Sequence, residues 1–333
     1  MIPRVSGFGF RVSGKDGTSA QPNLLAVVGP TASGKTSLAV RLAERLDTEI
    51  VSADSMQFYK GMEIGAGAPT ADELNRVKHH FVSFLDPSED FSAGAYEEMA
   101  REVVAGINAR GKIAVVAGGS GLYISALIDG LFQGPGKDES IRNRLQDEAE
   151  DLGVPGLYAR LQQADPDYAR VINQNDLRRI VRALEVFELR GAALSALHRE
   201  HHESTKSLDA VQLALNYPRD VLYARINARV DRMLEQGLLK EVQSLMARGY
   251  AGHIERLRSL GYREIAAHLR GECTLDAAIE LMKQNTRRYA KRQLTWFRGD
   301  PRIHWMPVAD QTAEAELVES ALRLLDRDEG ALT

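Results

Sequence analysis

The segment from Gly29 to Thr36, GPTASGKT, constrains this chain more than any other stretch of its sequence. It satisfies the phosphate-binding pattern G-x-x-x-x-G-K-[ST] at every required position. An apolar run over 24–28 predicts a buried strand directly before it, and the pattern over 36–46 predicts a helix directly after it. Glycines let such a loop fold around phosphate oxygens, and free amides at the helix N-terminus donate to them. The sequence therefore predicts a polyphosphate site.

The loop alone does not identify the phosphate ester that it binds. Lys35 supplies a positive charge and Thr36 a hydroxyl suited to Mg²⁺. Because two phosphates are enough to fill such a loop, three functions remain open at this point. They are an ATPase or GTPase, a small-molecule kinase, and an enzyme whose substrate carries a diphosphate leaving group.

Length and composition are those of a globular protein. The chain has 333 residues, of which 44% are hydrophobic and 26% charged, and this length allows two or three domains. No apolar run approaches the roughly 20 residues that a membrane helix needs, so we expect no membrane association. Residues 1–22 have no secretory signal pattern and are expected to be a flexible extension. The one cysteine, Cys273, excludes an internal disulfide and favours a reducing, cytoplasmic setting.

Strand and helix patterns alternate in the first part of the chain, which predicts a parallel sheet covered by helices. The expected strands are 24–28, 49–53, 112–117, 210–216 and the short 303–305, and Ser92 is expected to cap a helix that reaches residue 110. Between them lies a stretch with only helical periodicity, with helices expected over 138–151, 155–163 and 176–190. We therefore predict an α/β core resembling P-loop NTPases, formed by 23–133 and 206–333, and an inserted all-helical domain over 134–205.

Two further segments follow predicted strands. Asp54 comes directly after the second expected strand, where its carboxylate shares the ligand crevice with Lys35. The strand over 112–117 is followed by Gly118, Gly119 and Ser120, and not by the Mg²⁺-binding aspartate that nucleotide hydrolases carry. This difference weakens the ATPase interpretation. The position of Asp54 in the crevice favours a catalytic role for its carboxylate.

The net charge of −4 hides a basic C-terminal region. Between Arg256 and Arg302 there are eleven Lys/Arg and five Asp/Glu, interleaved with aromatic residues. This composition favours contacts with RNA phosphates and bases over a merely solvated helix face. Arg225 and Arg229 lie one helical turn apart and are suited to clamping a phosphate. The histidines at 79–80 and 198–202 lack a metal-binding context, so no zinc site is predicted.

Six motifs in order resemble the bacterial tRNA isopentenyltransferase (tRNA dimethylallyltransferase) family. They are GPTASGKT at 29–36, DSMQFYKGM at 54–62, GGSGLY at 118–123, NDLRR at 175–179, SLGYRE at 259–264 and AKRQLTWFR at 290–298. The chain departs from the family at Ser120, where a threonine is usual; the hydroxyl is kept. It also lacks the C-terminal zinc finger of eukaryotic relatives.

The resemblance implies transfer of a dimethylallyl group from dimethylallyl diphosphate to N6 of the adenosine 3′-adjacent to the anticodon, in tRNAs that read codons starting with U. The loop then holds the diphosphate of this substrate, with Mg²⁺ at Thr36. Catalytic roles are implied for Asp54, Ser120, Lys35 and Arg229. Diphosphate binding is implied for Gly29, Pro30, Thr31, Ala32, Ser33, Gly34, Lys35, Thr36, Arg225 and Arg229.

The family also implies a tRNA interface and a flipped acceptor base, with the helical insertion on the anticodon arm. The residues expected there are Asp54, Ser55, Met56, Gln57, Ser120, Arg142, Asn175, Asp176, Leu177, Arg178, Arg179, Arg258, Ser259, Leu260, Gly261, Tyr262, Arg263, Lys291 and Arg292. We expect a monomer. The competing functions are a nucleoside or small-molecule kinase, an adenylate isopentenyltransferase that uses a free nucleotide, and an RNA-binding protein with a vestigial loop.

Overall fold

The computed structural model describes residues 22–132, 134–204, 207–309 and 312–327. Apart from Pro22, the expected N-terminal extension 1–22 lies outside the described residues. The chain divides into two compact units, one formed by Met1–Ile128 with Leu208–Thr333 and the other by Asp129–Ser207. We refer to them as the core unit and the helical unit.

A six-stranded sheet organises the core unit, in the order β3-β2-β4-β1-β5-β6, with every neighbouring pair parallel. The strands are β1 (Leu24–Val28), β2 (Ile50–Ser52), β3 (His79–His80), β4 (Ala114–Gly118), β5 (Ala210–Asn216) and β6 (Ile303–Pro307). The predicted α/β class with a parallel sheet is therefore confirmed. The edge strand β3 was not expected from the sequence, since two residues are too few to show a period-2 pattern.

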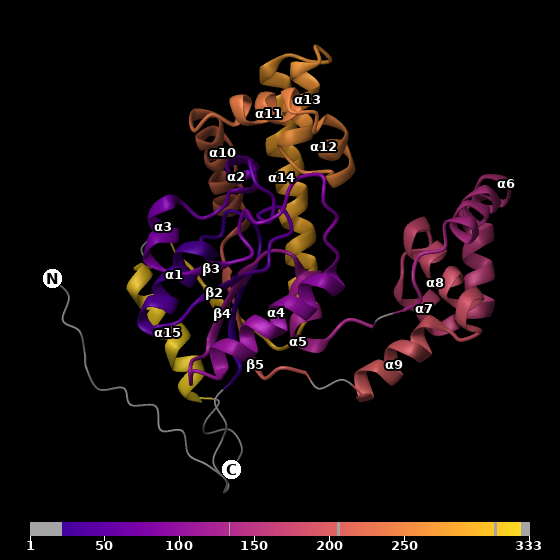
Figure 1. Ribbon diagram of the computed structural model, residues 1–333, viewed down its shortest axis with the longest axis horizontal. Helices are drawn as coiled ribbons and strands as arrows, with labels where there is room; N and C mark the ends of the chain where they lie inside the picture. Colours follow the sequence, from indigo (N-terminus) through magenta and orange to yellow (C-terminus); the bar gives the residue numbers. More distant parts are fainter. Residues whose placement is uncertain (1–21, 133, 205–206, 310–311, 328–333) are drawn as a thin grey trace, which may run out of the picture. The chain divides into compact units, whose positions relative to one another are not determined.

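Both faces of the sheet are covered by helices, as the continuous burial of β1 requires. Leu24, Ala26 and Val28 face a hydrophobic cluster with α4 (Ala93–Asn108) and α5 (Gly121–Asp129). Leu25 and Val27 face the opposite cluster, with α1 (Lys35–Arg45) and α15 (Glu314–Arg327). Figure 1 shows these two helix layers on either side of the strands. Ser92 caps α4 as predicted, because its side chain accepts a hydrogen bond from Ala95 N.

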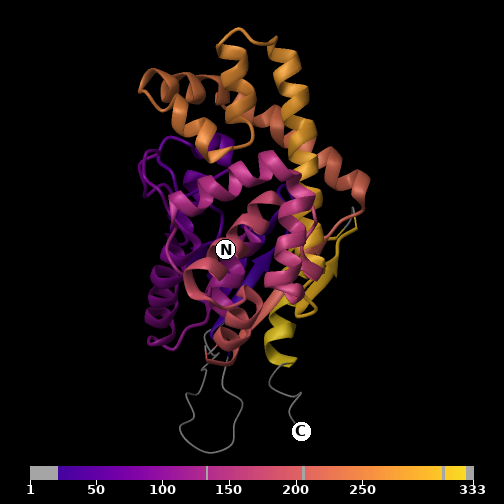
Figure 2. The ribbon, with the colours of Figure 1, turned by 90° about the vertical axis from the view of Figure 1, so that its right-hand side faces the viewer.

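A second group of helices extends the core unit beyond the carboxyl ends of the strands (Figures 1 and 2). It contains the short α2 (Glu63–Ala66), and then α10 (Arg219–Glu235), α11 (Leu238–Ala247), α12 (Ala251–Leu257), α13 (Tyr262–Leu269) and α14 (Leu275–Arg298). The remaining helix, α3 (Ala71–Arg76), is held by a capping box between Thr70 and Glu73. In both views α14 runs from the α11–α13 group down beside the sheet, so one helix links the two regions.

The helical unit has its own hydrophobic core. Its helices are α6 (Glu139–Ala164), α7 (Pro166–Val171), α8 (Leu177–Arg190) and α9 (Leu194–Ser204). Non-helical backbone at Gly153 breaks α6, which agrees with the two separate helices expected over 138–151 and 155–163. The sequence did not predict α7 or α9. Asp165 positions both, because its buried carboxylate accepts from Tyr168 N and from the Ser195 amide and hydroxyl.

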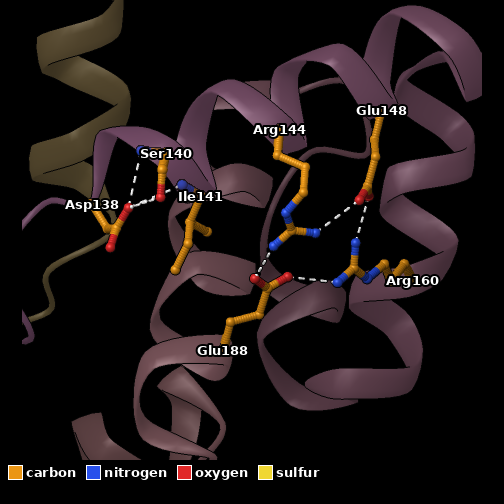
Figure 3. A network of polar contacts seen from close by, with 7 residues as sticks. All are labelled: Asp138, Ser140, Ile141, Arg144, Glu148, Arg160 and Glu188. Carbon is orange, nitrogen blue, oxygen red and sulfur yellow. Dashed lines mark hydrogen bonds and ion pairs between the residues drawn. The ribbon is translucent and has the colours of Figure 1, made fainter.

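Ion pairs join α6 to α8 inside the helical unit (Figure 3). Arg144 and Arg160 both bind Glu148 and Glu188, so that two cations and two anions alternate. A second cluster surrounds Glu185, a fully buried carboxylate. It accepts hydrogen bonds from Arg142 Nε at 2.8 Å, from Arg182 Nη1 at 2.7 Å and from the backbone amide of Asp138 at 2.8 Å.

Replacing the buried member of these clusters should destabilise the helical unit more than replacing an exposed one. Glu185→Ala leaves the Asp138 amide without its partner and should lower the free energy of unfolding by about 2–3 kcal/mol. Glu188→Ala removes partly exposed pairs and should lower it by about 1 kcal/mol or less. Hydrogen exchange of the α6 and α8 amides measures both effects, and equal losses would contradict this ranking.

Candidate active site

The loop after β1 has the backbone conformation of a phosphate cradle. Gly29 and Gly34 adopt φ values of 132° and 90°, which favour glycine, and Ala32 lies at 63°. Gly34 precedes α1 without any side-chain cap, so the first amides of this helix face the loop. The hydroxyl of Ser33 is buried and has no hydrogen-bond partner among the described residues. These unpaired donors suit an anion held inside the loop.

Lys35 is the buried cation of the site. Its Nζ donates to the carbonyl of Pro30 at 3.3 Å. Burial lowers the pKa of Lys35 to about 8; the Asp54 carboxylate opposes this shift and the Arg229 guanidinium adds to it. The lysine is therefore close to losing its proton at a moderately alkaline pH.

The two arginines predicted on one helix face have different surroundings. Arg229 is half-buried, and burial lowers its pKa while Asp54 opposes the shift. Its Nη2 donates to the carbonyl of Gly67 at 3.4 Å. Arg225 is exposed, donates from Nε to the carbonyl of Ala32 at 2.9 Å, and lies over the Tyr217 ring at 4.8 Å. Arg229 thus faces the charged centre, whereas Arg225 braces the loop from outside.

Backbone pairing between β2 and β4 brings Asp54 and Ser120 to the same edge of the sheet. Ser120 N donates to the carbonyl of Ala53, and Ser55 N donates to Ser120 Oγ at 3.2 Å. Asp54 Oδ1 accepts from the amide of Met56 at 3.2 Å. A carboxylate and a hydroxyl from neighbouring strands therefore lie beside the phosphate loop.

Two residues of α14 belong to this centre although the sequence did not single them out. Gln293 is buried; its Oε1 accepts from Thr31 N at 2.9 Å and its Nε2 donates to Gly119 O at 2.9 Å. It therefore ties the phosphate loop to the loop after β4. Tyr289 lies next to Ser120: burial raises the pKa of Tyr289, Asp54 adds to the rise, and hydrogen bonds with Ser120 and Gln293 oppose it. Because residues four positions apart lie on the same face of a helix, the spacing of Tyr289 and Gln293 was the feature of the sequence that could have linked them.

Some of these groups, but not Lys35, Ser120 or Gln293, line a cavity of about 250 Å³. Its lining includes the polar side chains of Asp54, Arg229 and Tyr289 and the apolar side chains of Val230, Met233 and Met282, which we call the apolar wall. The predicted site residues that line the cavity are Thr31, Asp54, Ser55, Met56, Arg229, Arg258, Ser259, Leu260 and Arg292.

Other predicted site residues of the core unit lie outside the lining of this cavity. Gln57 and Tyr262 are buried and hydrogen-bonded to other protein groups, as is the amide of Gly261, which donates to Glu264. Arg263 is exposed and pairs with Glu255. Lys291 is exposed on α14.

The predicted residues of the helical unit fall into two groups. Asn175, Arg178 and Arg179 are exposed near the start of α8. Asp176 caps that helix by accepting from Arg179 N, and Leu177 packs against the unit's core. Arg142 is held by Glu185. The exposed members suit contact with a polyanion, and the others shape the surface that carries them.

Thr36 lines a small second cavity of about 10 Å³, together with Lys35 and Ser52. Hydroxyl ligands fit Mg²⁺ when the ion arrives with phosphate oxygens and keeps part of its water shell. Within the described residues no group of three His, Cys, Asp or Glu side chains is arranged to hold a metal by itself.

None of the helices in the described residues combines the length and the apolar composition of a membrane span.

The lowered pKa of Lys35 makes anion binding depend on pH. Because a charged Lys35 attracts phosphate, the affinity for inorganic pyrophosphate should fall about tenfold between pH 7 and pH 9, as the lysine of the free protein loses its proton around pH 8. Calorimetric titration across this range measures the effect. In the control variant Lys35→Met, the affinity for pyrophosphate changes between pH 7 and pH 9 only through the titration of the ligand itself. An equal fall in affinity in both proteins would contradict the role of Lys35 as the titrating cation.

Known proteins resemble this chain over most of its length. The profile of the IPP transferase family matches residues 57–300. A tRNA dimethylallyltransferase of Geobacter metallireducens is 48% identical over 283 residues, which cover 85% of this chain and 92% of that protein. That of Geobacter sulfurreducens is 46% identical over 287 residues, covering 86% and 92%.

Solved structures of similar proteins also superpose on this chain. The tRNA isopentenylpyrophosphate transferase of Bacillus halodurans superposes with a TM-score of 0.66 and 38% identity, over 91% of this chain and 97% of that one. A eukaryotic dimethylallyltransferase acting on tRNA superposes with a TM-score of 0.74 and 27% identity, over 91% and 79%. This chain belongs to the IPP transferase family.

Proposed function

We propose that this protein transfers a dimethylallyl group from dimethylallyl diphosphate to N6 of the adenosine on the 3′ side of the tRNA anticodon. Membership of the family supports the reaction, because the relatives are tRNA dimethylallyltransferases. The assignment of the site depends on one observation, the set of residues that line the cavity of about 250 Å³. Its lining combines the Asp54 carboxylate and the half-buried Arg229 guanidinium with apolar side chains, and Lys35, which lines the second, smaller cavity, interacts electrostatically with both of these charges.

The cationic side of the cavity accounts for the leaving group. As the bond between C1 and the diphosphate oxygen breaks, negative charge grows on the diphosphate. In this proposal the loop amides, Lys35 and Arg229 stabilise this charge, and the burial that lowers the pKa of both side chains strengthens the interaction. Mg²⁺ bound through the Thr36 hydroxyl and the phosphate oxygens would neutralise further charge.

The Asp54 carboxylate suits the chemistry of the acceptor, which is the N6 amine of the adenosine. The lone pair of N6 attacks C1, the bond between C1 and oxygen breaks, and N6 then carries a proton that it must lose. Asp54 accepts that proton, and Ser120, hydrogen-bonded to the Ser55 amide, orients the amine. Because an exocyclic adenine amine is a weak nucleophile, its alignment with C1 contributes much of the rate.

The apolar wall accounts for the five-carbon group. Met233 lies one turn beyond Arg229 on α10, and Met282 lies two turns before Tyr289 on α14. Both helices thus contribute polar and apolar side chains to the lining of the cavity. A dimethylallyl group whose diphosphate sits at Arg229 would lie against Val230 and Met233, where its burial is favourable.

Exposed cations are suited to contact the phosphates of the tRNA. Arg258 and Arg292 border the cavity, and Lys291 is their exposed neighbour. Trp296 is 45% exposed on the same helix and offers a surface on which a base can stack. In the helical unit, Arg178 and Arg179 supply further phosphate contacts to the anticodon arm. A monomer acting on cytoplasmic tRNA fits this assignment.

The central experiment incubates the purified protein with labelled dimethylallyl diphosphate, Mg²⁺ and unmodified tRNA. Label should appear in the adenosine beside the anticodon, and AMP should not replace tRNA as the acceptor. Label on AMP alone would identify an adenylate isopentenyltransferase, and phosphate transfer from ATP to a small alcohol would identify a kinase.

Asp54→Asn keeps the size of the side chain but removes the proton acceptor. We expect prenyl transfer to slow by about 10²-fold or more, with tRNA binding unchanged. Single-turnover kinetics with preformed tRNA complex measures the chemical step. Asp47→Asn, a change of an exposed carboxylate that pairs with Lys112, serves as the matched control. Near-normal turnover by Asp54→Asn would remove Asp54 from the mechanism.

Lys291→Ala removes an exposed cation from α14 and should weaken tRNA binding uniformly across sequences. The slope of log affinity against log salt concentration should become shallower by about one unit, because one phosphate contact fewer is made. Lys283→Ala is the control on the same helix, since Lys283 is already paired with Asp231 at 2.7 Å. Identical slopes for the wild-type protein and Lys291→Ala would exclude a phosphate contact.

A further inference from the structure

The guanidinium of Arg229 rests on a short segment that sequence motifs do not connect with it. This segment, 63–67, contains α2 and ends at Gly67, and we call it the α2 platform. Gly67 has φ 57°, and a Cβ atom there would lie 1.6 Å from Arg229 Nη2. Backbone and guanidinium therefore touch, and a side chain at position 67 would displace the arginine.

The carbonyl of Gly67 fixes this contact. It accepts from Arg229 Nη2 at 3.4 Å and from Gln57 Nε2 at 3.1 Å. Gln57 is buried, and its Oε1 accepts from Ser52 Oγ at 3.1 Å. Although Gln57 was expected at the tRNA interface, its amide joins the end of β2 to the α2 platform instead.

Glu241 of α11 holds the other end of the platform. Its Oε2 accepts from Ile64 N at 2.9 Å, and its Oε1 accepts from Gly65 N at 3.0 Å. Tyr262 donates from its hydroxyl to Oε1 at 2.6 Å. A Cβ atom on Gly65 would lie 2.4 Å from the Tyr262 ring, so the platform is pressed against that ring. One carboxylate thus fixes two amides of the short helix.

Arg229 needs such a support because a competing partner is near. Asp54 is the charge that most favours the charged form of Arg229, yet the two side chains form no ion pair among the described residues. If the platform moved, the guanidinium would be free to turn toward Asp54. That pairing would withdraw the cation from the diphosphate and occupy the carboxylate that accepts the N6 proton.

We propose that Glu241, assisted by Tyr262, is a positioning residue that holds Arg229 in the diphosphate site through the α2 platform. The proposal rests on the proposed function, since it takes Arg229 as a diphosphate ligand. It also assigns Tyr262 to the diphosphate site rather than to direct tRNA contact, because Tyr262 is fully buried.

A double-mutant cycle on binding tests this coupling. Dimethylallyl diphosphate is titrated calorimetrically, without tRNA, into the wild-type protein, Glu241→Gln, Arg229→Ala and the double variant. Arg229→Ala should weaken binding by about 10-fold or more. Glu241→Gln, which replaces one acceptor with a donor, should weaken binding by about 3- to 10-fold. In the Arg229→Ala background, Glu241→Gln should have less than about a 2-fold further effect.

The measured affinities test the role of Arg229 and the role of Glu241 separately. If Arg229→Ala leaves affinity unchanged, the assignment of Arg229 in the proposed function fails. If Arg229→Ala weakens binding but Glu241→Gln does not, or if the two effects multiply, only the positioning role of Glu241 fails.

Tyr262→Phe provides an independent check with a matched control. It should weaken diphosphate binding and leave the affinity for tRNA unchanged. Tyr250→Phe also removes a hydroxyl that donates to a carboxylate, Asp86 at 2.7 Å, and should change neither affinity. A loss of tRNA affinity alone in Tyr262→Phe would return this residue to the tRNA interface and overturn its assignment here.

Discussion

The site depends on an unequal number of positive and negative charges that interact with one another. Lys35 and Arg229 are two cations drawn from water toward one carboxylate, Asp54, and burial lowers the pKa of each cation. Two like charges in a region of low dielectric repel each other more strongly than in water. An anionic ligand, such as the diphosphate of the proposed substrate, would supply the missing negative charge. The free protein is thus organised for an anion before one binds.

The parallel sheet makes this arrangement possible. Strands β1, β2 and β4 end at one edge, and each contributes one functional loop. Ala53 ties two of these loops together, because its amide donates to Ala117 O and its carbonyl accepts from Ser120 N. The functional groups therefore inherit their spacing from the strand register. Small displacements of such groups matter, since attack by a weak nucleophile depends on geometry.

Local patterns in the sequence predicted the parts of the structure that are local. The phosphate loop, the buried strands β1 and β5 and the Ser92 cap are determined by neighbouring residues. Gln293 and Glu241 were missed because their partners lie far away in the chain, at Thr31 and Gly65. Because Tyr262 and Gln57 are buried, their polar atoms bind other protein groups. The motifs that contain these two residues do not reveal which groups their side chains face.

The loop after β4 shows why this phosphate site differs chemically from a hydrolase. A Cβ atom on Gly118 would lie 2.2 Å from the carbonyl of Ala53, and one on Gly119 would lie 2.3 Å from Gln293 Nε2. A side chain at either position, including the aspartate of nucleotide hydrolases, would clash with protein groups. The space that such a carboxylate occupies is taken by α14, whose Gln293 binds the phosphate loop while Arg292 borders the cavity. The packing of Gln293 beside Gly119 thus leaves no room there for a carboxylate that would bind Mg²⁺ as in a nucleotide hydrolase.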